Sequence, residues 1–255
     1  MATPTLKQIT MYLNKELKIN SFKESSKNGL LVKASGNITK IGFCVDPCME
    51  SFQKAKKFGC ELLITHHSII RKGVRDELRE KRISFLKNNM ISLYSLHQPL
   101  DINPKYGNNI IIARHLGLYL IKMFGKEKSG YWGYQGRLRK PLSTNTILAK
   151  INAILPLYIV RKPIILNFGR NKNKNIAIIT GSGSFALTEA KRNNIDLLIT
   201  GEIKHSTYHE AKELGINIIA AGHYNTETLG VKTLQKLLSD KFKVKTVFID
   251  CPTGL

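Results

Sequence analysis

Leu62-Leu-Ile-Thr65 is a short run of apolar and β-branched residues, and it decides how the rest of the chain is interpreted. A continuous run of this kind, ended by the polar pair His66-His67, is typical of a parallel strand that is buried on both faces. The same tetrapeptide recurs as Leu197-Leu-Ile-Thr200, where Gly201-Glu202 follow it. The two copies predict that the chain builds the same kind of sheet twice.

Strand-like and helix-like segments alternate along all 255 residues. Helices are predicted over residues 5–18, 49–58, 74–88, 108–116, 144–154, 184–192, 205–214 and 226–238. Strands are predicted over residues 40–45, 62–65, 91–96, 158–167, 175–180, 197–200, 217–220 and 244–249. This alternation predicts an α/β protein with mostly parallel sheets.

The repeat extends beyond the tetrapeptide. Six residues of the first half (Ile41, Ala55 and Leu62–Thr65) match six of the second at a constant offset of 135. At the following strand the offset is 126, which places His97 on His223 and Asp101 on Glu227. Short apolar strands resemble one another by chance, but we favour a partial duplication in which each half ends its strands with similar polar groups.

Six polar residues fall at the carboxyl ends of the predicted strands: His66, His67, His97, Asp101, His223 and Glu227. A single histidine after a strand is usually a loop residue. Parallel sheets, however, bind ligands beyond these strand ends, and four imidazoles with two carboxylates suit Zn, Fe, Mn or a similar divalent ion. The set is too large for one tetrahedral ion and would serve two ions with a bridging carboxylate.

The motifs that carry these residues resemble a known family. They are Leu63-Ile-Thr-His-His67, Leu96-His-Gln-Pro-Leu-Asp101, Ile199-Thr-Gly-Glu-Ile-Lys-His205 and Ala221-Gly-His-Tyr-Asn-Thr-Glu227, joined by Ser26-Lys-Asn-Gly-Leu30. Together they resemble the GTP cyclohydrolase 1 type 2 homologues, the NGG-interacting-factor-three group, over about residues 25–250. The combination is specific, whereas each fragment alone is weak.

The resemblance implies two linked α/β domains, with two divalent metal ions per subunit at the domain interface, in a toroidal homohexamer. It carries the metal ligands over to His66, His67, Asp101, His223 and Glu227, with Glu227 bridging. His97 is implied beside the site, as a supporting group or a catalytic acid or base. Ser68 stands where the family usually has Pro, and Gln98-Pro99 where it has Thr-Asn. Neither change removes a ligand, although both alter the site's surroundings.

The net charge is +22, from 40 Lys and Arg against 18 Asp and Glu. Residues 122–174 hold twelve of the cations and one acid, so half of the net charge lies in about a fifth of the chain. We expect domains over 1–121 and 122–255, the second beginning with this basic segment. Interleaved Tyr131, Trp132, Tyr134 and Phe168 suit nucleic acid, single- or double-stranded and without sequence preference. A solvated lysine-rich surface is the alternative.

Two further segments carry weaker signals. Thr180-Gly-Ser-Gly-Ser184 follows a strand and could present N–H groups to a phosphate, but it lacks the third glycine of a dinucleotide loop and the lysine of a P-loop. A tight turn with Ser184 as helix N-cap is favoured. The basic run around residues 71–82 is diluted by acids and is interpreted as a solvated helix face.

Composition excludes several classes of protein. Hydrophobic residues make up 42% and charged residues 23%, which argues against a disordered or fibrous chain. Four cysteines without a CxxC pair indicate free thiols rather than a disulfide framework or a structural zinc site. The sequence has neither a signal-peptide pattern nor a membrane-spanning run, so we expect a cytoplasmic protein with no membrane partner. Two functions remain open, a metal-dependent hydrolase and a nucleic-acid-binding oligomeric ring with structural metals.

Overall fold

The computed structural model describes residues 3–73, 76–156 and 162–254, which form two compact units. Unit 1 comprises Met1–Leu100 and Gly230–Cys251, and unit 2 comprises Asp101–Leu229 and Pro252–Leu255. Each unit has one sheet, and most strand neighbours in the two sheets' repeated cores are parallel, which confirms the α/β class.

The division of the chain differs from the predicted boundary between residues 121 and 122. The last helix begins in unit 2 and continues into unit 1, and a final strand of unit 1 follows it. Because unit 1 is made of two separate segments of the chain, no single cut point divides the two units. The domain bounds 1–121 and 122–255 stay a prediction from the sequence.

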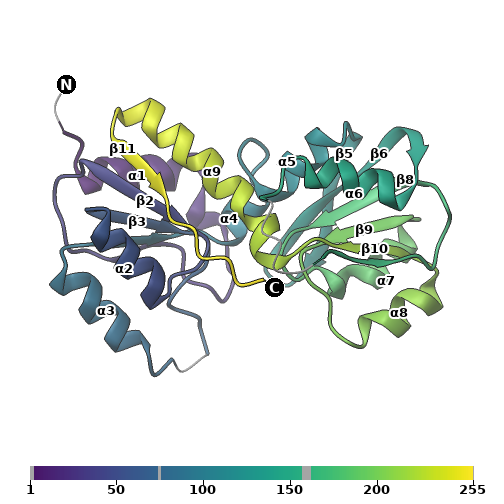
Figure 1. The fold of residues 1–255 in the computed structure, drawn as a ribbon, viewed down its shortest axis with the longest axis horizontal. Coiled ribbons are helices and arrows are strands. Elements are labelled where there is room, and N and C mark those ends of the chain that lie inside the picture. The colour runs from purple at the N-terminus through teal and green to yellow at the C-terminus, as the bar shows by residue number, and fades with distance from the viewer. Residues whose placement is uncertain (1–2, 74–75, 157–161, 255) are drawn as a thin grey trace. The chain divides into compact units, whose positions relative to one another are not determined.

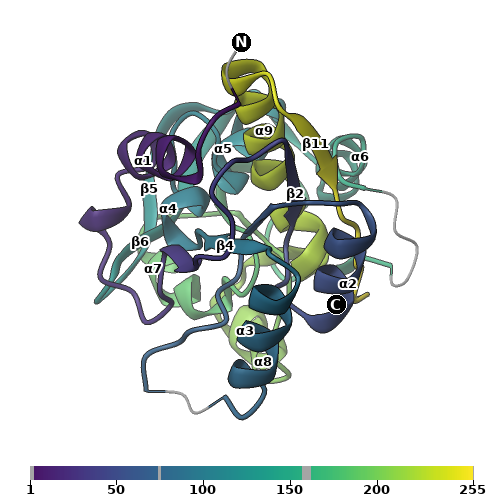
Figure 2. The same ribbon diagram turned by 90° about the vertical axis from the view of Figure 1, so that its left-hand side faces the viewer.

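Unit 1 is a three-layer α/β/α unit (Figures 1 and 2). Its strands are β1 (Gly29–Val32), β2 (Lys40–Cys44), β3 (Leu62–Thr65), β4 (Ser92–Ser95) and β11 (Lys245–Phe248), in the order β1-β4-β3-β2-β11. Its helices are α1 (Leu6–Glu16), the 3₁₀ turn η1 (Ile19–Ser21), α2 (Met49–Lys57), α3 (Arg79–Asn88), part of α4 (Gln98–Asp101) and most of α9 (His223–Phe242). Helices α2 and α3 cover one face of the sheet, and α1 and α9 cover the other.

Unit 2 repeats this layering around a longer sheet. Its strands are β5 (Tyr119–Glu127), β6 (Gly130–Leu142), β7 (Ile164–Leu166), β8 (Asn173–Ile179), β9 (Leu197–Thr200) and β10 (Asn217–Ala220), in the order β5-β6-β8-β9-β10-β7. Helices α5 (Asn108–His115) and α6 (Thr144–Asn152) lie on one face of the sheet. The 3₁₀ turn η2 (Ser184–Ala186), α7 (Leu187–Arg192) and α8 (Thr207–Leu214) lie on the other.

The two sheets share a four-strand frame. Parallel β2, β3 and β4 correspond to parallel β8, β9 and β10, and antiparallel β1 and β7 flank β4 and β10 at equivalent edges. The register agrees as well, because Cys44 pairs with Thr65 and Ile179 pairs with Thr200, each 135 residues later. This topology supports the predicted partial duplication.

A carboxylate clamp repeats at the start of each frame. Glu61 accepts hydrogen bonds from the backbone N–H groups of Thr39 and Lys40 at 3.0 and 2.8 Å. Asp196, 135 residues later, accepts from the N–H groups of Lys174 and Asn175, both at 2.9 Å. Each carboxylate therefore ties the residue before the central strand to the beginning of its neighbour.

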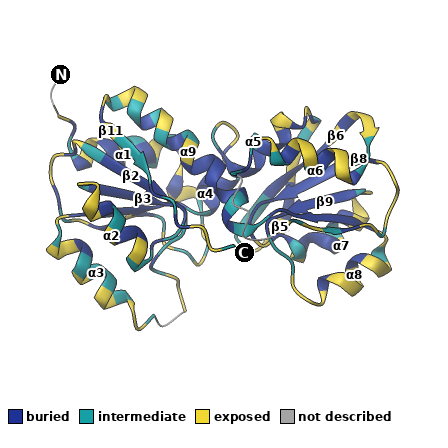
Figure 3. Ribbon diagram, viewed as in Figure 1, coloured by how far each residue is buried: buried dark blue, intermediate teal, exposed yellow. Residues whose placement is uncertain are grey.

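Both sheets are buried between helices, as Figure 3 shows by the dark strands and the exposed outer faces of the helices. In unit 1, Phe52 and Ala55 of α2 and Leu86 of α3 pack with Leu63 and Leu93 of the sheet. In unit 2, one core joins the sheet to α5 and α6 and another joins it to α7 and α8. Such two-sided burial explains why the central strands have no polar alternation.

Local sequence signals mark several element ends. Thr5 and Gln8 form a reciprocal capping box at the start of α1. Gly59 lies just beyond α2 with a φ of +67°, the left-handed conformation that glycine favours at this position. In the part of the chain that the structure describes, no helix combines the length and apolar character needed to cross a bilayer.

The β5–β6 hairpin is the main element that the sequence pattern did not predict. Charged side chains interrupt its alternation, so its residues were treated only as a basic segment. Strand β1 was also missed. The helix predicted from residue 74 begins at Arg79, and residues 74–75 lie outside the described residues. The strand predicted over 158–167 is described only as Ile164–Leu166, because 157–161 lie outside the described part.

Candidate metal centre

Three histidines of unit 1 meet at the carboxyl ends of β3 and β4. His66 and His67 follow β3 directly, and His97 follows β4. Their ring centroids are 5.0 to 5.5 Å apart. One ring nitrogen from each lies within 4.8 Å of the others, so the three could share a metal ion.

Two adjacent histidines reach one place because the backbone bends as β3 ends. His66 and His67 both lie in a bend, and the Thr65 hydroxyl donates to the carbonyl of His67 at 2.7 Å. The N–H groups of the two histidines still bond to Cys44 and Val45 of the neighbouring chain segment, at 3.1 and 2.9 Å. The turn is thus fixed by the backbone, and neighbouring side chains that would diverge in a strand converge here.

In each of the three imidazoles, Nδ1 lies at hydrogen-bond distance from an acceptor oxygen. His66 Nδ1 lies 3.1 Å from the carbonyl oxygen of Leu96, and His67 Nδ1 lies 2.7 Å from Asp46 Oδ1. His97 Nδ1 lies 2.5 Å from Glu24 Oε2. Because these oxygens accept, the proton of a neutral ring is on Nδ1 and the lone pair is on Nε2, the arrangement that metal-binding histidines generally have.

The Glu24 carboxylate supports His97 from a loop that precedes β1. Its side chain is only 3% exposed, and it also accepts hydrogen bonds from Asn28 Nδ2 and from the N–H of Gln98. Burial acts to raise the pKa of Glu24, but the hydrogen bond and positive charge of His97, with the other donors, lower it overall. The Asn28 side chain accepts from the N–H of His97 at 2.7 Å, so the Ser26–Leu30 motif helps to fix this histidine.

Unit 2 carries a histidine and a glutamate on the first turns of α9. His223 begins the helix, and its Nε2 lies 3.2 Å from Oε2 of Glu227, four residues later. His223 Nδ1 lies 3.2 Å from Glu202 Oε1. Burial acts to raise the pKa of Glu202, but the Ser182 hydroxyl and the charge of His223 lower it overall.

The glycine-rich loop makes room for these groups. A Cβ at Gly181 would overlap Oε1 of Glu227 and would lie 3.2 Å from Nε2 of His223. A Cβ at Gly201 would lie 2.7 Å from the Cα of His223. Ser184, predicted as a helix N-cap, caps neither η2 nor α7 with its side chain. The glycines therefore serve the close approach of α9 as well as the turn.

Asp101 is nearly buried and is held by three polar residues of unit 2. Its Oδ1 accepts from Asn108 Nδ2 at 2.9 Å and from the Thr180 hydroxyl at 3.2 Å. Asn109 Nδ2 donates to the Asp101 carbonyl, and Asn109 Oδ1 accepts from the N–H of Thr180. A buried carboxylate needs such donors because burial alone strongly disfavours its charge.

The predicted equivalence of His97 and His223 is shifted by one residue in the strand frame. Ser95 pairs with Thr65, and Ala220 pairs with Thr200, so the two strand ends are 125 residues apart, whereas the histidines are 126 apart. His97 is thus two residues beyond its strand and His223 three. This explains why His97 sits beside Glu24 while His223 begins a helix.

The roles of the supporting residues escaped sequence reasoning because single acids, amides and hydroxyls carry no pattern. They are Glu24, Asn28, Asp46, Asn108, Asn109, Thr180 and Glu202. Asp46, Thr180 and Glu202 were detectable in principle, since each directly follows or lies close behind a strand end. The other four precede β1 or lie on α5 and are recognised only by their contacts.

A small cavity lies beside the strand ends of unit 2. It has a volume of about 160 Å³ and is lined by Glu202, Gly201, Gly222 and Asn225, with Ile164 and Lys162 at its side. A ligand there would lie next to the turn that carries His223. Its mixture of backbone, apolar and charged groups suits a small polar molecule.

The aromatic residues of the basic segment are largely occupied by packing. Tyr134 is 5% exposed and its hydroxyl donates to the carbonyl of Ile102 at 2.6 Å. Trp132 and Phe168 pack against the core on the α7 face of the sheet. Tyr131 lies below the Lys126 ammonium at 5.9 Å. The predicted run of stacking aromatics is therefore wrong for Tyr134, whose ring lies in the core.

Residues 4–253 match the family described as Duf34/NIF3 (NGG1p interacting factor 3). The chain belongs to this family. It is 42% identical to a GTP cyclohydrolase 1 type 2 homolog of Pyrococcus abyssi over 250 residues, 97% of this chain and 98% of the relative. It is 36% identical to one from Archaeoglobus fulgidus, over 98% of this chain and 99% of the relative.

The fold is shared with solved members of the Duf34/NIF3 family. The crystal structure of a Thermus thermophilus protein, TTHA1606, aligns with a TM-score of 0.86 at 31% identity, over 99% of this chain and all of that one. The predicted family is therefore confirmed. The structure itself supplies the two α/β units and the clusters of histidine and carboxylate groups that could hold a metal ion.

Proposed function

We propose that this Duf34/NIF3 protein binds two divalent transition-metal ions and uses them to hydrolyse a small phosphorylated or heterocyclic substrate. One observation carries the proposal: three imidazoles of unit 1 cluster, and Nδ1 of each ring hydrogen-bonds to an acceptor oxygen. Such contacts fix the ring orientation and the tautomer that metal binding needs. The donor set therefore fits Zn, Fe, Mn or a similar ion.

The ligands in this proposal are His66, His67, Asp101, His223 and Glu227, and Glu227 would be the bridging carboxylate. Nitrogen and oxygen ligands in this proportion suit a pair of ions better than one tetrahedral ion. The donors that hold Asp101 and the glycines around Glu227 support this assignment, because they keep both carboxylates in place.

A divalent ion supplies Lewis acidity, which lowers the pKa of a coordinated water and polarises a phosphoryl or carbonyl oxygen. The chain supplies the rest. His97 accepts or donates the proton, and Glu24 keeps its ring oriented. The cavity beside Glu202 and Asn225 would hold the part of the substrate that does not react.

Elemental analysis of the purified protein tests this proposal. We expect bound transition metal in the natural protein, and its loss in the double variant His223→Ala and Glu227→Ala. His115→Ala is the matched control, because this exposed histidine hydrogen-bonds the carbonyl of Lys150 and belongs to none of the metal-capable clusters of the described residues, so its loss should leave the metal content unchanged. A natural protein free of transition metal would overturn the metal assignment.

Catalysis is tested separately from binding. His97→Ala should abolish metal-dependent turnover of a phosphoester or heterocyclic substrate and leave the two ions bound. Turnover that survives either this change or a chelator would contradict the hydrolase proposal.

A second candidate function is sequence-independent binding of DNA or RNA by an oligomeric ring whose metals are structural. Exposed Arg137, Arg139 and Lys140 on β6 favour it. The triple replacement of these residues by Gln should flatten the salt dependence of DNA retardation. No retardation at low salt would end this alternative. Light scattering that gives six times 28.7 kDa would support the homohexamer that the family resemblance implies.

A further inference from the structure

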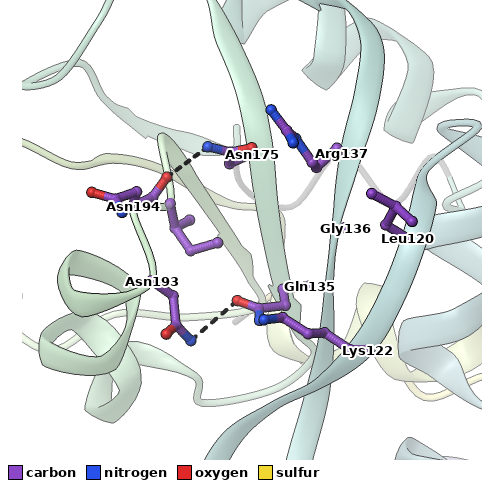
Figure 4. Close-up of a pocket in the computed structure, with 9 residues that line it drawn as sticks. Leu120, Lys122, Gln135, Gly136, Arg137, Asn175, Asn193 and Asn194 are labelled. Carbon is purple, nitrogen blue, oxygen red and sulfur yellow. Dashed lines mark hydrogen bonds between the residues drawn. The ribbon is translucent and has the colours of Figure 1, made fainter.

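The amino end of the sheet of unit 2 holds a second cavity, of about 380 Å³ (Figure 4). Strand residues Lys122, Gln135, Arg137 and Asn175 line one side, and Asn193 and Asn194, just beyond α7, line the other. The two asparagines directly follow α7, which ends at Arg192. The volume is within the range of small-molecule sites.

Two cations flank the amide of Gln135. Lys122 lies opposite Gln135 across the β5–β6 pair, and Arg137 is two residues further along β6 on the same face. Both cations are exposed, and neither forms an ion pair with a carboxylate of the described residues. No Asp or Glu is among the described lining residues. The cavity therefore favours an anion, and a phosphate suits paired Lys and Arg donors.

The amides give the cavity a second property. Gln135 is only 5% exposed, and its Oε1 accepts from Asn193 Nδ2 at 3.2 Å. Asn175 Nδ2 donates to the carbonyl of Asn194 at 2.9 Å. These contacts hold the amides in fixed orientations, as the dashed lines of Figure 4 show. Since every amide offers both donor and acceptor atoms, these side chains can hydrogen-bond to the edge of a polar heterocycle.

The cavity is separate from the strand-end groups of unit 2. Asn175 lies near the start of β8 and Ile179 ends that strand four residues later, and a strand rises about 3.3 Å per residue. The cavity is therefore about 13 Å from the strand end that precedes the turn of Gly181, and its lining residues include neither His223 nor Glu227.

A neighbouring cavity continues the basic surface. It has a volume of about 220 Å³, shares Asn175, Asn194 and Ile195 with the first cavity, and adds Arg170 and Lys191. Asp196, which also lines it, already accepts two backbone hydrogen bonds and lies 3.9 Å from Arg170. A second phosphate along a strand would find cations there.

We propose that the cavity of Lys122 and Arg137 binds a nucleoside phosphate, with the phosphate between the two cations and the base against the asparagine amides. The site goes beyond the proposed metal chemistry and does not depend on it. The nucleotide is either free or part of a nucleic-acid strand that continues past Asn175 toward Arg170.

Isothermal titration of chelator-treated protein with AMP, adenosine and inorganic phosphate tests this site. AMP should bind more tightly than either fragment. The double variant Lys122→Gln and Arg137→Gln should weaken AMP binding at least about tenfold, because two charge-assisted hydrogen bonds are lost. The matched control is Lys56→Gln with Lys57→Gln, which removes the same charge from the exposed surface of α2 in unit 1 and should change binding less than about twofold.

Two further measurements keep the outcome decisive. Asn193→Asp preserves the side-chain shape but puts a negative charge in the cavity, and it should also weaken AMP binding about tenfold. Equal losses in the two double variants, or AMP binding no tighter than phosphate, would overturn the site. A phosphorylated tetranucleotide that binds well above AMP with the same variant pattern identifies a strand as ligand, and equal affinity identifies the free nucleotide. Because chelated protein is used, failure here leaves the metal proposal intact.

Discussion

The two units place different chemistry on one backbone frame. At equivalent positions after the strands, unit 1 has Asp46, His66 and His67, whereas unit 2 has Gly181, Gly201 and Glu202, each 135 residues later. In unit 1 the imidazoles come from the end of the central strand. In unit 2 that position is glycine, and the imidazole comes from the first residue of α9.

The difference shows how a repeated frame can supply unlike ligands. A side chain at Gly201 would meet the Cα of His223, so the space that the first copy fills with a histidine is filled in the second by a helix. Asp46 and Glu202 nevertheless play the same part, since each binds Nδ1 of a histidine in its own unit. The two units share the strand frame, but their histidines come from different elements, a strand end in unit 1 and a helix start in unit 2.

The largest expected effect comes from Gly181. Gly181→Ala should lower the free energy of unfolding by roughly 2–3 kcal/mol, because the left-handed φ of +66° is strained by a Cβ that also displaces Glu227. Gly59→Ala is the matched control in unit 1: its φ is +67° and a Cβ there meets nothing within 4 Å, so about 1 kcal/mol is expected. Urea unfolding measures both free energies. Equal losses of stability in the two variants would show that a Cβ at Gly181 does not disturb Glu227.

The cysteines give a pH test of unit 1 alone, because all four lie in it. Burial raises the pKa of the Cys60 thiol to about 11. An unfolded thiol ionises near about 8.5, so the stabilisation is complete below that pH and is lost as the pH rises toward 11. Cys60 alone should make unit 1 about 2 kcal/mol less stable at pH 10 than at pH 8, and the raised pKa of the Cys251 and Cys44 thiols acts in the same direction.

Two probes separate the units in that experiment. Thiol alkylation in urea reports unit 1, and fluorescence of Trp132, the single tryptophan, reports unit 2. The thiol midpoint should fall more between pH 8 and pH 10 than the fluorescence midpoint. Identical shifts at both probes would mean that the units unfold as one cooperative body.

The residues that orient the histidines should matter about equally in the two units. Asp46→Asn and Glu202→Gln should each weaken metal binding about tenfold, because an amide no longer fixes the proton on Nδ1. Chelator competition measures the affinity. Loss in only one of the two variants would show that a single unit controls the metal.

The smallest effect concerns the repeated clamps. Glu61→Gln and Asp196→Asn should each cost about 1 kcal/mol, since each removes charge from two backbone hydrogen bonds. Asp240→Asn, at an exposed carboxylate paired with Lys236, should cost less than about 0.5 kcal/mol. Unequal clamp losses in urea unfolding would argue that the frames differ in how they are held.

Sequence reasoning found the parts of the fold that follow from burial. Leu62–Thr65, Leu197–Thr200 and Asn217–Ala220 have the predicted limits because buried parallel strands require uninterrupted apolar runs. The β5–β6 hairpin was missed because one of its faces meets solvent, and Lys122, Arg137 and Arg139 obscure its alternation.

The sequence predicted only those residues of the candidate site that lie at strand ends. His66, His67 and His97 lie where their strands end, and their clustering follows from parallel neighbours. Glu24 could not be predicted in the same way, because its bond to His97 joins residues 73 apart through a loop. Contacts of that kind depend on the path of a loop, which no periodicity records.

Helix α9 has a consequence for the order in which the chain is made. Strand β11, which pairs with β2, follows α9 and is made after Asp101–Leu229 of unit 2. One edge of the unit 1 sheet therefore stays open until residues 245–248 have emerged from the ribosome. By then most of unit 2 has already been made. A nascent chain shortened before residue 245 leaves β2 paired with β3 alone, without β11 on its other side.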